Sequence, residues 1–382
     1  MARPTRFVRR FLATEAAGGV VLLVAAVVSL LLANSPWHAG WESLWETGAT
    51  VEVGRWSISE DLRHWVNDGL MAVFFFVVGL EIKRELVLGE LRDRRAAAIP
   101  ALAALGGMVV PALVFLLFTA GTAGSRGWGI PMATDIAFAV GVLAVLGRRV
   151  PASLKLFLLT LAIVDDIGAI LVIAVFYSAG IEPLALLVAA ALLVGVVLVH
   201  RAGVHVAAVH LSLGVAVWVA VFQSGVHATI AGVALGLVTP ARRADELEHD
   251  LHPVSSFLVI PVFALANAGV RIEGDALGAA GAGRLVAGVA LGLVVGKVLG
   301  ITGATWLAVR LGIGRLPSGA RWPQVVGVAA VAGIGFTVSL FVAGLAYDDP
   351  QLVAAAKIGI LGGSLVAALA GSGILLAVHR RR

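Results

Sequence analysis

Long apolar stretches, separated by short polar segments, follow one another along almost the whole chain. A helix needs about 20 predominantly apolar residues to cross the hydrocarbon core of a bilayer, and most of these stretches have roughly that length. The pattern therefore predicts an all-α integral membrane protein with about twelve transmembrane helices. The expected segments are 13–33, 62–82, 96–118, 128–147, 151–176, 182–200, 204–220, 225–240, 254–271, 285–309, 323–346 and 354–378.

One segment between the first two apolar stretches has a different periodicity. From Thr50 to Ile58, apolar and polar residues alternate on both sides of Gly54-Arg55. Alternation with a period of two is typical of strands, so we expect a small β-hairpin over 50–58. The exposed edge of such a hairpin can pair with a second chain. On the residues alone, a lid over its own subunit is an equally good interpretation.

The basic residues gather in every second loop. They include Arg9-Arg10, Lys83-Arg84, Arg148-Arg149, Arg242-Arg243 and Arg380 to Arg382. Loops rich in Lys and Arg face the cytoplasm. We therefore expect both termini on the cytoplasmic side and the hairpin on the outer side.

The composition favours a membrane protein and argues against several other kinds of protein and site. Hydrophobic residues make up 60% of the chain and charged residues 13%, whereas soluble domains are roughly one quarter charged. The net charge of +5 would favour nucleic acid as a partner in a soluble protein. Here the basic residues act as orientation signals, and no nucleic acid partner is expected. The absence of cysteine excludes disulfides and thiolate metal sites.

The predicted topology permits an internal inverted repeat. Three consecutive spans within 96–176 begin on the cytoplasmic side, and three within 285–378 begin on the outer side. Units of opposite orientation are typical of secondary transporters. We expect these two ranges to form the core of a single unit over 1–382, with 13–82 and 182–271 as interface helices.

Two corresponding spans of this repeat carry helix-breaking residues. Pro131 removes a backbone donor, and Thr134 and Asp135 can hydrogen-bond to the freed backbone. The second interruption is at Gly333 and Gly335, because Gly is a poor helix former. We expect two interrupted helices that cross near the middle of the membrane, which is where transporters bind their substrates.

Besides Asp135, three charged residues near the middle of apolar spans stand out. Asp165 and Asp166 are adjacent in 151–176, and Lys297 is central in 285–309. A charge at the bilayer centre costs about 2.5–3.5 kcal/mol on insertion scales, so such residues are functional candidates. Neighbouring positions on a helix point about 100° apart. One carboxylate can therefore face an aqueous cavity while the other faces Lys297, and hard oxygen ligands suit small hard cations.

Further candidates lie outside the spans or at their ends. His227 begins a span near the outer face and is a candidate pH-sensing residue, because histidine titrates near physiological pH. An interfacial hydrogen bond is the simpler interpretation of His227. Two charged segments on the cytoplasmic side form either a solvated surface or a funnel that attracts cations and senses pH. They contain Glu81, Lys83, Arg84 and Glu85, and Asp245, Glu246, Glu248, His249, Asp250 and His252.

Other functions fit these residues less well. A magnesium-dependent prenyl-transfer site needs a second Asp-rich motif, and an intramembrane aspartyl protease leaves one carboxylate of the pair unexplained. A channel needs a filter-like segment. A sodium-coupled symporter of organic solutes remains as the alternative, although few neutral polar groups are available to bind a solute. No cofactor is expected.

Taken together, these residues resemble the NhaA family of bacterial sodium–proton antiporters. The similarity runs from about residue 11 to the end of the chain. The motifs that carry it are Gly79–Leu86, Ala133–Ala139, Ala162–Ile170, Ser224–Thr229, Leu247–His249, Phe263–Val270, Gly296–Lys297 and Gly333–Thr337.

The resemblance implies electrogenic export of Na⁺ or Li⁺ in exchange for H⁺ across the bacterial inner membrane, without enzyme activity. It implies that Asp165 and Asp166 bind the transported ions and that Thr134 and Asp135 assist at the crossing. Lys297 would either pair with Asp165 or balance the ends of the half-helices. It also implies a homodimer formed through the hairpin. The implied cytoplasmic pH sensor consists of Glu81, Arg84, Glu85, Glu248, His249 and His252.

The chain departs from the family pattern at one place. Family members carry basic residues just before the Leu247-Glu248-His249 motif, whereas this chain has Asp245-Glu246. This difference leaves the ion-binding residues unchanged and bears on the pH at which transport begins.

Overall fold

A computed structural model of the chain describes residues 6–53, 56–178, 180–204, 206–272 and 281–380. The expected turn residues Gly54 and Arg55 lie outside these ranges. The chain divides into two compact units, which are described separately. Unit 1 contains 1–24, 90–169 and 270–382, and unit 2 contains 25–89 and 170–269.

Unit 1 is entirely helical in its described part. Two helices, α1 (Arg6–Ala33) and α7 (Ala152–Phe176), continue into unit 2. The helices of unit 1 proper are η2 (Glu90–Arg92), α5 (Arg94–Thr119), η3 (Ala123–Met132), α6 (Ile136–Leu146), η4 (Gly147–Arg149), α13 (Ala282–Leu291), η7 (Gly292–Gly296), α14 (Lys297–Arg310), α15 (Trp322–Val331), α16 (Phe336–Ala346) and α17 (Pro350–Arg380).

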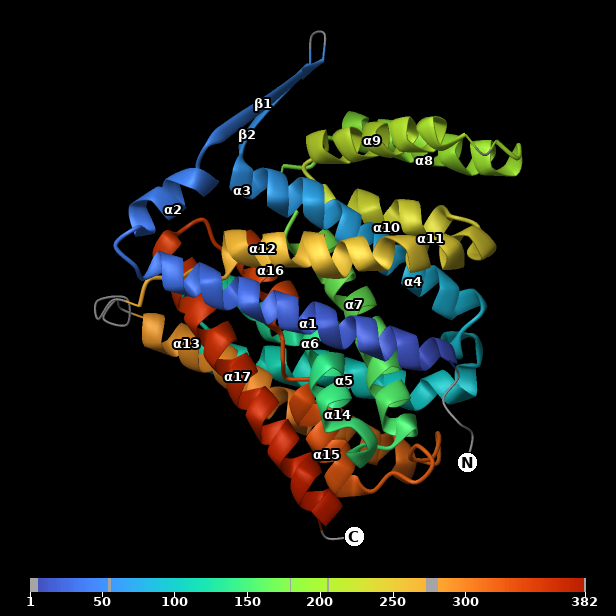
Figure 1. Cartoon of the computed structure of the whole chain (residues 1–382), viewed down its shortest axis with the longest axis vertical. Coiled ribbons are helices and arrows are strands. Elements are labelled where there is room, and N and C mark those ends of the chain that lie inside the picture. Colours follow the sequence, from blue (N-terminus) through green and yellow to red (C-terminus); the bar gives the residue numbers. More distant parts are fainter. Residues whose placement is uncertain (1–5, 54–55, 179, 205, 273–280, 381–382) are drawn as a thin grey trace. The chain divides into compact units, whose positions relative to one another are not determined.

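Unit 2 combines helices with the expected hairpin (Figure 1). Its elements are α2 (His38–Trp45), β1 (Gly48–Val53), β2 (Trp56–Asp61), α3 (Leu62–His64), η1 (Trp65–Leu70), α4 (Met71–Val87), α8 (Pro183–Arg201), α9 (Ala207–Gln223), α10 (Thr229–Val238), α11 (Ala241–Val254), η5 (Ser255–Val259) and α12 (Ile260–Asn267).

Each of the twelve expected apolar segments is mostly helical in its described residues. Six helices of the described part are long and apolar enough to cross a membrane, and up to nine are if each bent pair forms one span. The shorter apolar helices α9 and α10 and the charged helix over 62–87 cover the remaining segments. The largest boundary difference is at α11, because the helix expected from residue 254 already begins at Ala241 with a charged stretch.

Both expected helix interruptions are present in unit 1. The chain bends by 43° between η3 and α6, and by 49° between α15 and α16. In the first bend Pro131 lies in the last turn of η3, and Ala133 and Asp135 have extended backbone angles. In the second bend Gly333 and Gly335 lie between the two half-helices. The fold class predicted from the sequence is confirmed in these features.

Glycine allows α5 and α14 of unit 1 to pack backbone against backbone. A Cβ atom placed on Gly300 would lie 2.1 Å from the carbonyl oxygen of Gly106, which no real side chain can do. In membrane helices such small residues permit close approach of the two backbones. This contact holds α14 close to α5. The first residue of α14 is Lys297.

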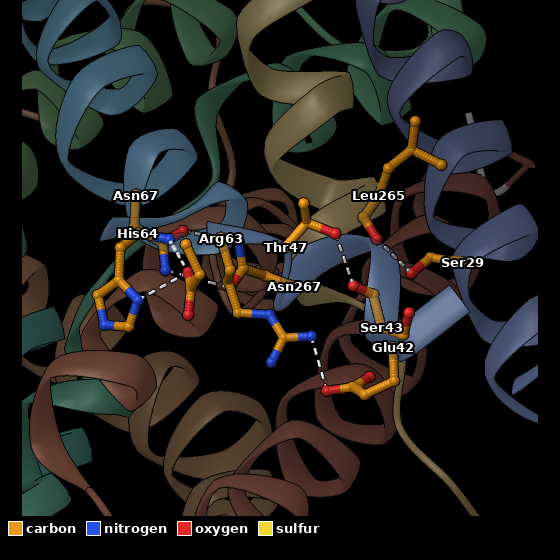
Figure 2. Close-up of polar contacts among 10 residues, drawn as sticks. Ser29, Glu42, Ser43, Thr47, Arg63, His64, Asn67, Leu265 and Asn267 are labelled. Atoms are coloured by element: carbon orange, nitrogen blue, oxygen red, sulfur yellow. Dashed lines mark hydrogen bonds and ion pairs between the residues drawn. The ribbon is translucent and has the colours of Figure 1, made fainter. Parts of the chain in front are cut away.

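The hairpin of unit 2 is an antiparallel pair with Val51 opposite Ile58 and Gly48 opposite Asp61. Figure 1 shows it extending away from α2 and α3. Its base is held by side chains, as Figure 2 shows for the ion pair of Arg63 with Glu42, whose nitrogen and oxygen atoms lie 2.8 Å apart. The indole of Trp65 donates a hydrogen bond of 2.8 Å to Ala49 O.

A second set of polar contacts in Figure 2 joins helices of unit 2. Asn267 at the end of α12 donates to Asn67 Oδ1 of η1 at 2.8 Å, and Ser29 donates to Leu265 O at 2.7 Å. Without such partners, buried amides and hydroxyls inside a membrane span would be costly.

Candidate ion-binding site

The two interrupted helices of unit 1 meet at their breaks and satisfy each other's backbone groups. The amide N–H of Asp135 donates to Ile334 O at 2.6 Å. The hydroxyl of Thr134 donates to Ala332 O at 2.9 Å. The first interruption therefore supplies donors to carbonyls that the second interruption leaves without a helical partner, as a backbone away from water requires.

The Asp135 carboxylate accepts hydrogen bonds from the first turns of α6 and α16, the half-helices that follow the two interruptions. Its Oδ1 accepts from the Phe138 N–H of α6 at 3.0 Å. Its Oδ2 accepts from the Thr337 N–H at 3.0 Å and from the Thr337 hydroxyl at 2.6 Å, both in α16. A carboxylate at a helix N-terminus satisfies free amides and interacts favourably with the helix dipole. Asp135 therefore links α6 to α16.

Lys297 contacts the C-terminal end of a half-helix. Its ammonium group donates to Met132 O, at the C-terminus of η3, and to Thr134 Oγ1 at 3.0 Å. It also forms an ion pair of 2.7 Å with Asp165 Oδ2. The side chains of Lys297 and Asp165 are completely buried. Lys297 thus both pairs with a carboxylate and compensates the negative end of a half-helix.

The adjacent carboxylates differ in their surroundings. Asp165 Oδ1 is buried and accepts no hydrogen bond from the described residues. Asp166 is slightly more accessible, at 6% exposure, and its charge acts on Lys297. A buried carboxylate oxygen without a donor is costly unless a proton or cation reaches it. The carboxylate oxygens together with the Thr134 hydroxyl are hard ligands of the kind that bind a small cation.

The structure adds polar residues that sequence reasoning did not assign. Ser339 donates to Ile130 O at 2.7 Å, and Ser364 of α17 accepts from the Gly335 N–H at 3.2 Å. In the sequence, Thr337 stands out only as the last residue of the Gly333–Thr337 motif. Serine and threonine in apolar spans are weak signals, because they also bond to their own helix. Only the crossing shows which of them act between helices.

A second charged group lies in unit 2, between α4 and α11. Arg84 pairs with Glu248 at 2.9 Å and with Glu85 at 3.0 Å. Glu81, one turn earlier on α4, acts electrostatically on both Arg84 and Glu248. Four of the six residues expected to sense pH are thus brought together, and Arg84 and Glu248 are buried.

The three histidines named as candidates in the sequence differ in their contacts. His252 acts on Glu248 through its charge, whereas His249 is exposed on α11. The ring of His227 donates to Tyr177 O at 2.7 Å. This contact matches the simpler interpretation of His227 as a hydrogen-bonding residue.

Crossed, interrupted helices with a buried lysine and two carboxylates define a membrane protein that transports ions. The chain matches the family model described as Na⁺/H⁺ antiporter 1 over residues 9–375. It therefore belongs to the Na⁺/H⁺ antiporter 1 family. It is a transporter and not an enzyme, and the prediction of sodium–proton exchange is confirmed at the level of the family.

Individual relatives cover nearly the whole chain. The chain is 47% identical to Na(+)/H(+) antiporter NhaA of Serratia proteamaculans, over 97% of this chain and 98% of that relative. It is 50% identical to Na(+)/H(+) antiporter NhaA 2 of Erythrobacter litoralis, over 96% of this chain and 93% of the relative. For Na(+)/H(+) antiporter NhaA 3 of Frankia alni the identity is 46%, over 98% and 89%.

Proposed function

We propose that this chain exports Na⁺ or Li⁺ from a bacterial cell in exchange for H⁺, and that both ions use the Asp165–Asp166 site in turn. A cation arriving from the cytoplasm displaces protons from the carboxylates. The cation is released outside, and the protonated form returns. The single observation that supports this site most is the buried Oδ1 of Asp165, which lacks a donor although its partner oxygen is held by Lys297.

The exchange is electrogenic, because a site with two carboxylates and a lysine releases more than one proton for each monovalent cation that it binds. Protons are then driven inward by the membrane potential as well as by the pH gradient, since each charge gains about 2.3 kcal/mol per 100 mV. Such an exchanger serves sodium and pH homeostasis. Its place is the bacterial inner membrane, with both termini in the cytoplasm.

The site assignment is tested in everted membrane vesicles that carry a dye for the pH gradient. Sodium added to vesicles with the unaltered protein should cause rapid dequenching, and Asp166→Asn should abolish it. Asp348→Asn makes the same chemical change at an exposed position and should leave the signal intact. Normal exchange by Asp166→Asn would refute the site.

The Arg84–Glu85–Glu248 group, with Glu81 and His252 nearby, regulates the exchange by pH. It joins α4 to α11 through one guanidinium group that pairs with two carboxylates. Adding or removing a proton changes the balance of charge around Arg84 and therefore the contact between the two helices. Asp245-Glu246 adds negative charge at the start of α11 and changes the pH at which this happens.

The regulatory role is tested with Glu248→Gln. The pH at half-maximal exchange should move by at least half a unit, while the maximal rate stays within about twofold. Asp250→Asn is the matched control, because Asp250 is exposed on the same helix. A lost maximal rate at an unchanged pH midpoint would show a structural role instead.

The hairpin joins two copies of the chain into a homodimer by pairing of strand edges. Both strands have exposed residues, and Val51 is 51% exposed. Val51→Pro removes a backbone donor and should shift the protein to monomers in native mass spectrometry, whereas Val51→Thr keeps the strand preference and should stay dimeric. Dimers that withstand the proline would remove the hairpin from the interface.

A further inference from the structure

Two histidines meet at the end of the α8–α9 pair, and neither belongs to the ion-binding site or to the charged group between α4 and α11. The two helices lie side by side in unit 2 (Figure 1). His200 is in the last turn of α8, and His210 is in the first turn of α9. His210 Nε2 lies 3.2 Å from His200 Nδ1. Both rings are partly buried.

The hydrogen bonds determine which nitrogen of His210 has a lone pair available. His210 Nδ1 lies 3.0 Å from Val206 O. A carbonyl oxygen only accepts, so Nδ1 carries the hydrogen, and Nε2 of the neutral ring is the acceptor. Histidines that bind metals are oriented in the same way, with the second ring nitrogen donating to a backbone carbonyl.

The spacing of the two facing nitrogens, His200 Nδ1 and His210 Nε2, fits one tetrahedral metal ion. With metal–nitrogen distances of about 2.0–2.1 Å, two ligands of a tetrahedral zinc lie about 3.3 Å apart. The observed 3.2 Å is close to this value. The ring centroids are 4.7 Å apart, so the rings converge at these two nitrogens. The present contact is a His–His hydrogen bond, which a metal ion replaces once His200 moves its hydrogen to Nε2.

We infer that His200 and His210 form a binding site for one divalent transition-metal ion, with water completing the coordination. Imidazole nitrogen favours Zn²⁺, Ni²⁺ and Cu²⁺, whereas Ca²⁺ and Mg²⁺ require oxygen ligands. The site is separate from the transport carboxylates, which present oxygen atoms. A bound ion joins the end of α8 to the start of α9.

Two factors affect how strongly this site binds a divalent ion: the charge of Arg201 and the number of ligands. Arg201 follows His200 and is exposed. Its positive charge disfavours a divalent ion, but solvent and salt screen exposed charges. Two imidazole ligands without a carboxylate give a weaker site than the three or four ligands of structural zinc sites. Binding at micromolar concentrations is therefore the expected range.

The site is tested on the purified full-length protein by titration with ZnCl₂ and NiCl₂ in a calorimeter, with thermal unfolding as the second measurement. We expect saturable binding, a higher unfolding temperature with metal, and reversal by EDTA. His210→Gln should weaken the binding at least tenfold, as should His200→Gln. CaCl₂ should give no comparable signal.

His379→Gln is the matched control, because His379 lies near the end of α17 in unit 1. It should bind Zn²⁺ like the unaltered protein. Since neither His200 nor His210 belongs to the transport site, both variants should keep sodium–proton exchange without metal. Equal Zn²⁺ binding by His210→Gln and the unaltered chain would overturn the inference, and so would an absence of saturable binding up to 100-fold molar excess. In the latter case the pair is a hydrogen bond only.

Discussion

Each buried charge of unit 1 has a partner that its chemistry requires. Lys297 faces Asp165 and a carbonyl at a helix C-terminus, and Asp135 faces amides at two helix N-termini. Removing ions from water is expensive, and their attraction repays this only with good geometry and further hydrogen bonds. Lys297 and Asp165 are therefore interdependent, because removing either one leaves the other charge buried alone.

Lys297→Met should strongly destabilise the protein, because it leaves Asp165 as an uncompensated buried charge. Breaking a buried ion pair costs about 3–5 kcal/mol. The double variant Lys297→Met/Asp165→Asn removes both charges and should recover much of this loss. Thermal or denaturant unfolding of the detergent-solubilised proteins measures both. If the double variant were as unstable as the single one, the pair would not be the source of the effect.

Thr337→Val should loosen the crossing, because the valine has the shape of threonine but cannot donate to Asp135 Oδ2. A hydrogen bond to a charged group contributes about 1.5–3 kcal/mol. We expect a stability loss of this size together with a weaker apparent affinity for sodium. Thr337→Ser keeps the hydroxyl and should stay close to the unaltered protein in both measurements.

At the scale of elements, composition predicts where helices break but not what joins the broken ends. Pro131, Gly333 and Gly335 marked both interruptions in the sequence. The hydrogen bonds that hold the bends come from residues about 200 positions away, as in the Thr134–Ala332 contact. The sequence also does not show which helices pack closely. A glycine that permits a helix contact cannot be told in the sequence from one that faces lipid.

Gly300→Ala should therefore be much more harmful than Gly303→Ala on the same helix. A Cβ on Gly300 would meet the Gly106 backbone, whereas a Cβ on Gly303 has no neighbour within 4 Å. Alanine is the better helix former by about 0.8–1.0 kcal/mol, so Gly303→Ala should be neutral or stabilising. Unfolding temperatures of the two variants test this difference, and similar values would contradict the close contact of α5 with α14.

Asp61 makes the base of the hairpin sensitive to acid. Burial raises the pKa of its carboxyl, but hydrogen bonds from the backbone and ring of His64, with the charges of His64 and Arg63, outweigh this and lower the pKa below its usual value. A lowered carboxyl pKa stabilises the folded state above about pH 4, and this contribution is lost as the pH falls through the folded-state pKa.

Hydrogen exchange of the His64 amide, which donates to Asp61 Oδ1 at 2.7 Å, measures this effect. Its protection factor should fall in acid in the unaltered protein. Asp61→Asn is also a good N-cap but does not titrate in this range, so its protection factor should stay constant with pH. Relative to Asp61→Asn, Asp61→Ala should lose about 0.5–2 kcal/mol of local stability at every pH.

At the scale of the whole molecule, the apolar segments place the chain in the membrane, and the distribution of charge decides which side each loop faces. The chain has no cysteine, so single cysteines can be introduced without altering other positions. Arg242→Cys and Glu52→Cys are both at exposed positions. A membrane-impermeant maleimide should label Glu52→Cys in intact cells and Arg242→Cys only in everted vesicles. Labelling of both from one side would contradict the proposed orientation.

From the sequence alone one can predict the order of the apolar helices, the hairpin, both helix breaks and the charged residues inside spans. These features are readable because they are local: apolar length, alternation and helix breakers act within a few residues. The family motifs added the ion that is exchanged. The division into core and interface helices and the inverted repeat stay predictions.

Only the tertiary structure decided which atoms of the charged residues pair. Asp135 accepts hydrogen bonds from α6 and α16, and its part in ion binding stays a prediction. Lys297 contacts both Asp165 and Met132 O, where the sequence left a carboxylate and a helix end as alternatives. His249 is exposed on α11, whereas its neighbour Glu248 is buried. Such assignments depend on the directions of side chains from helices distant in sequence, and no spacing along one chain specifies those directions.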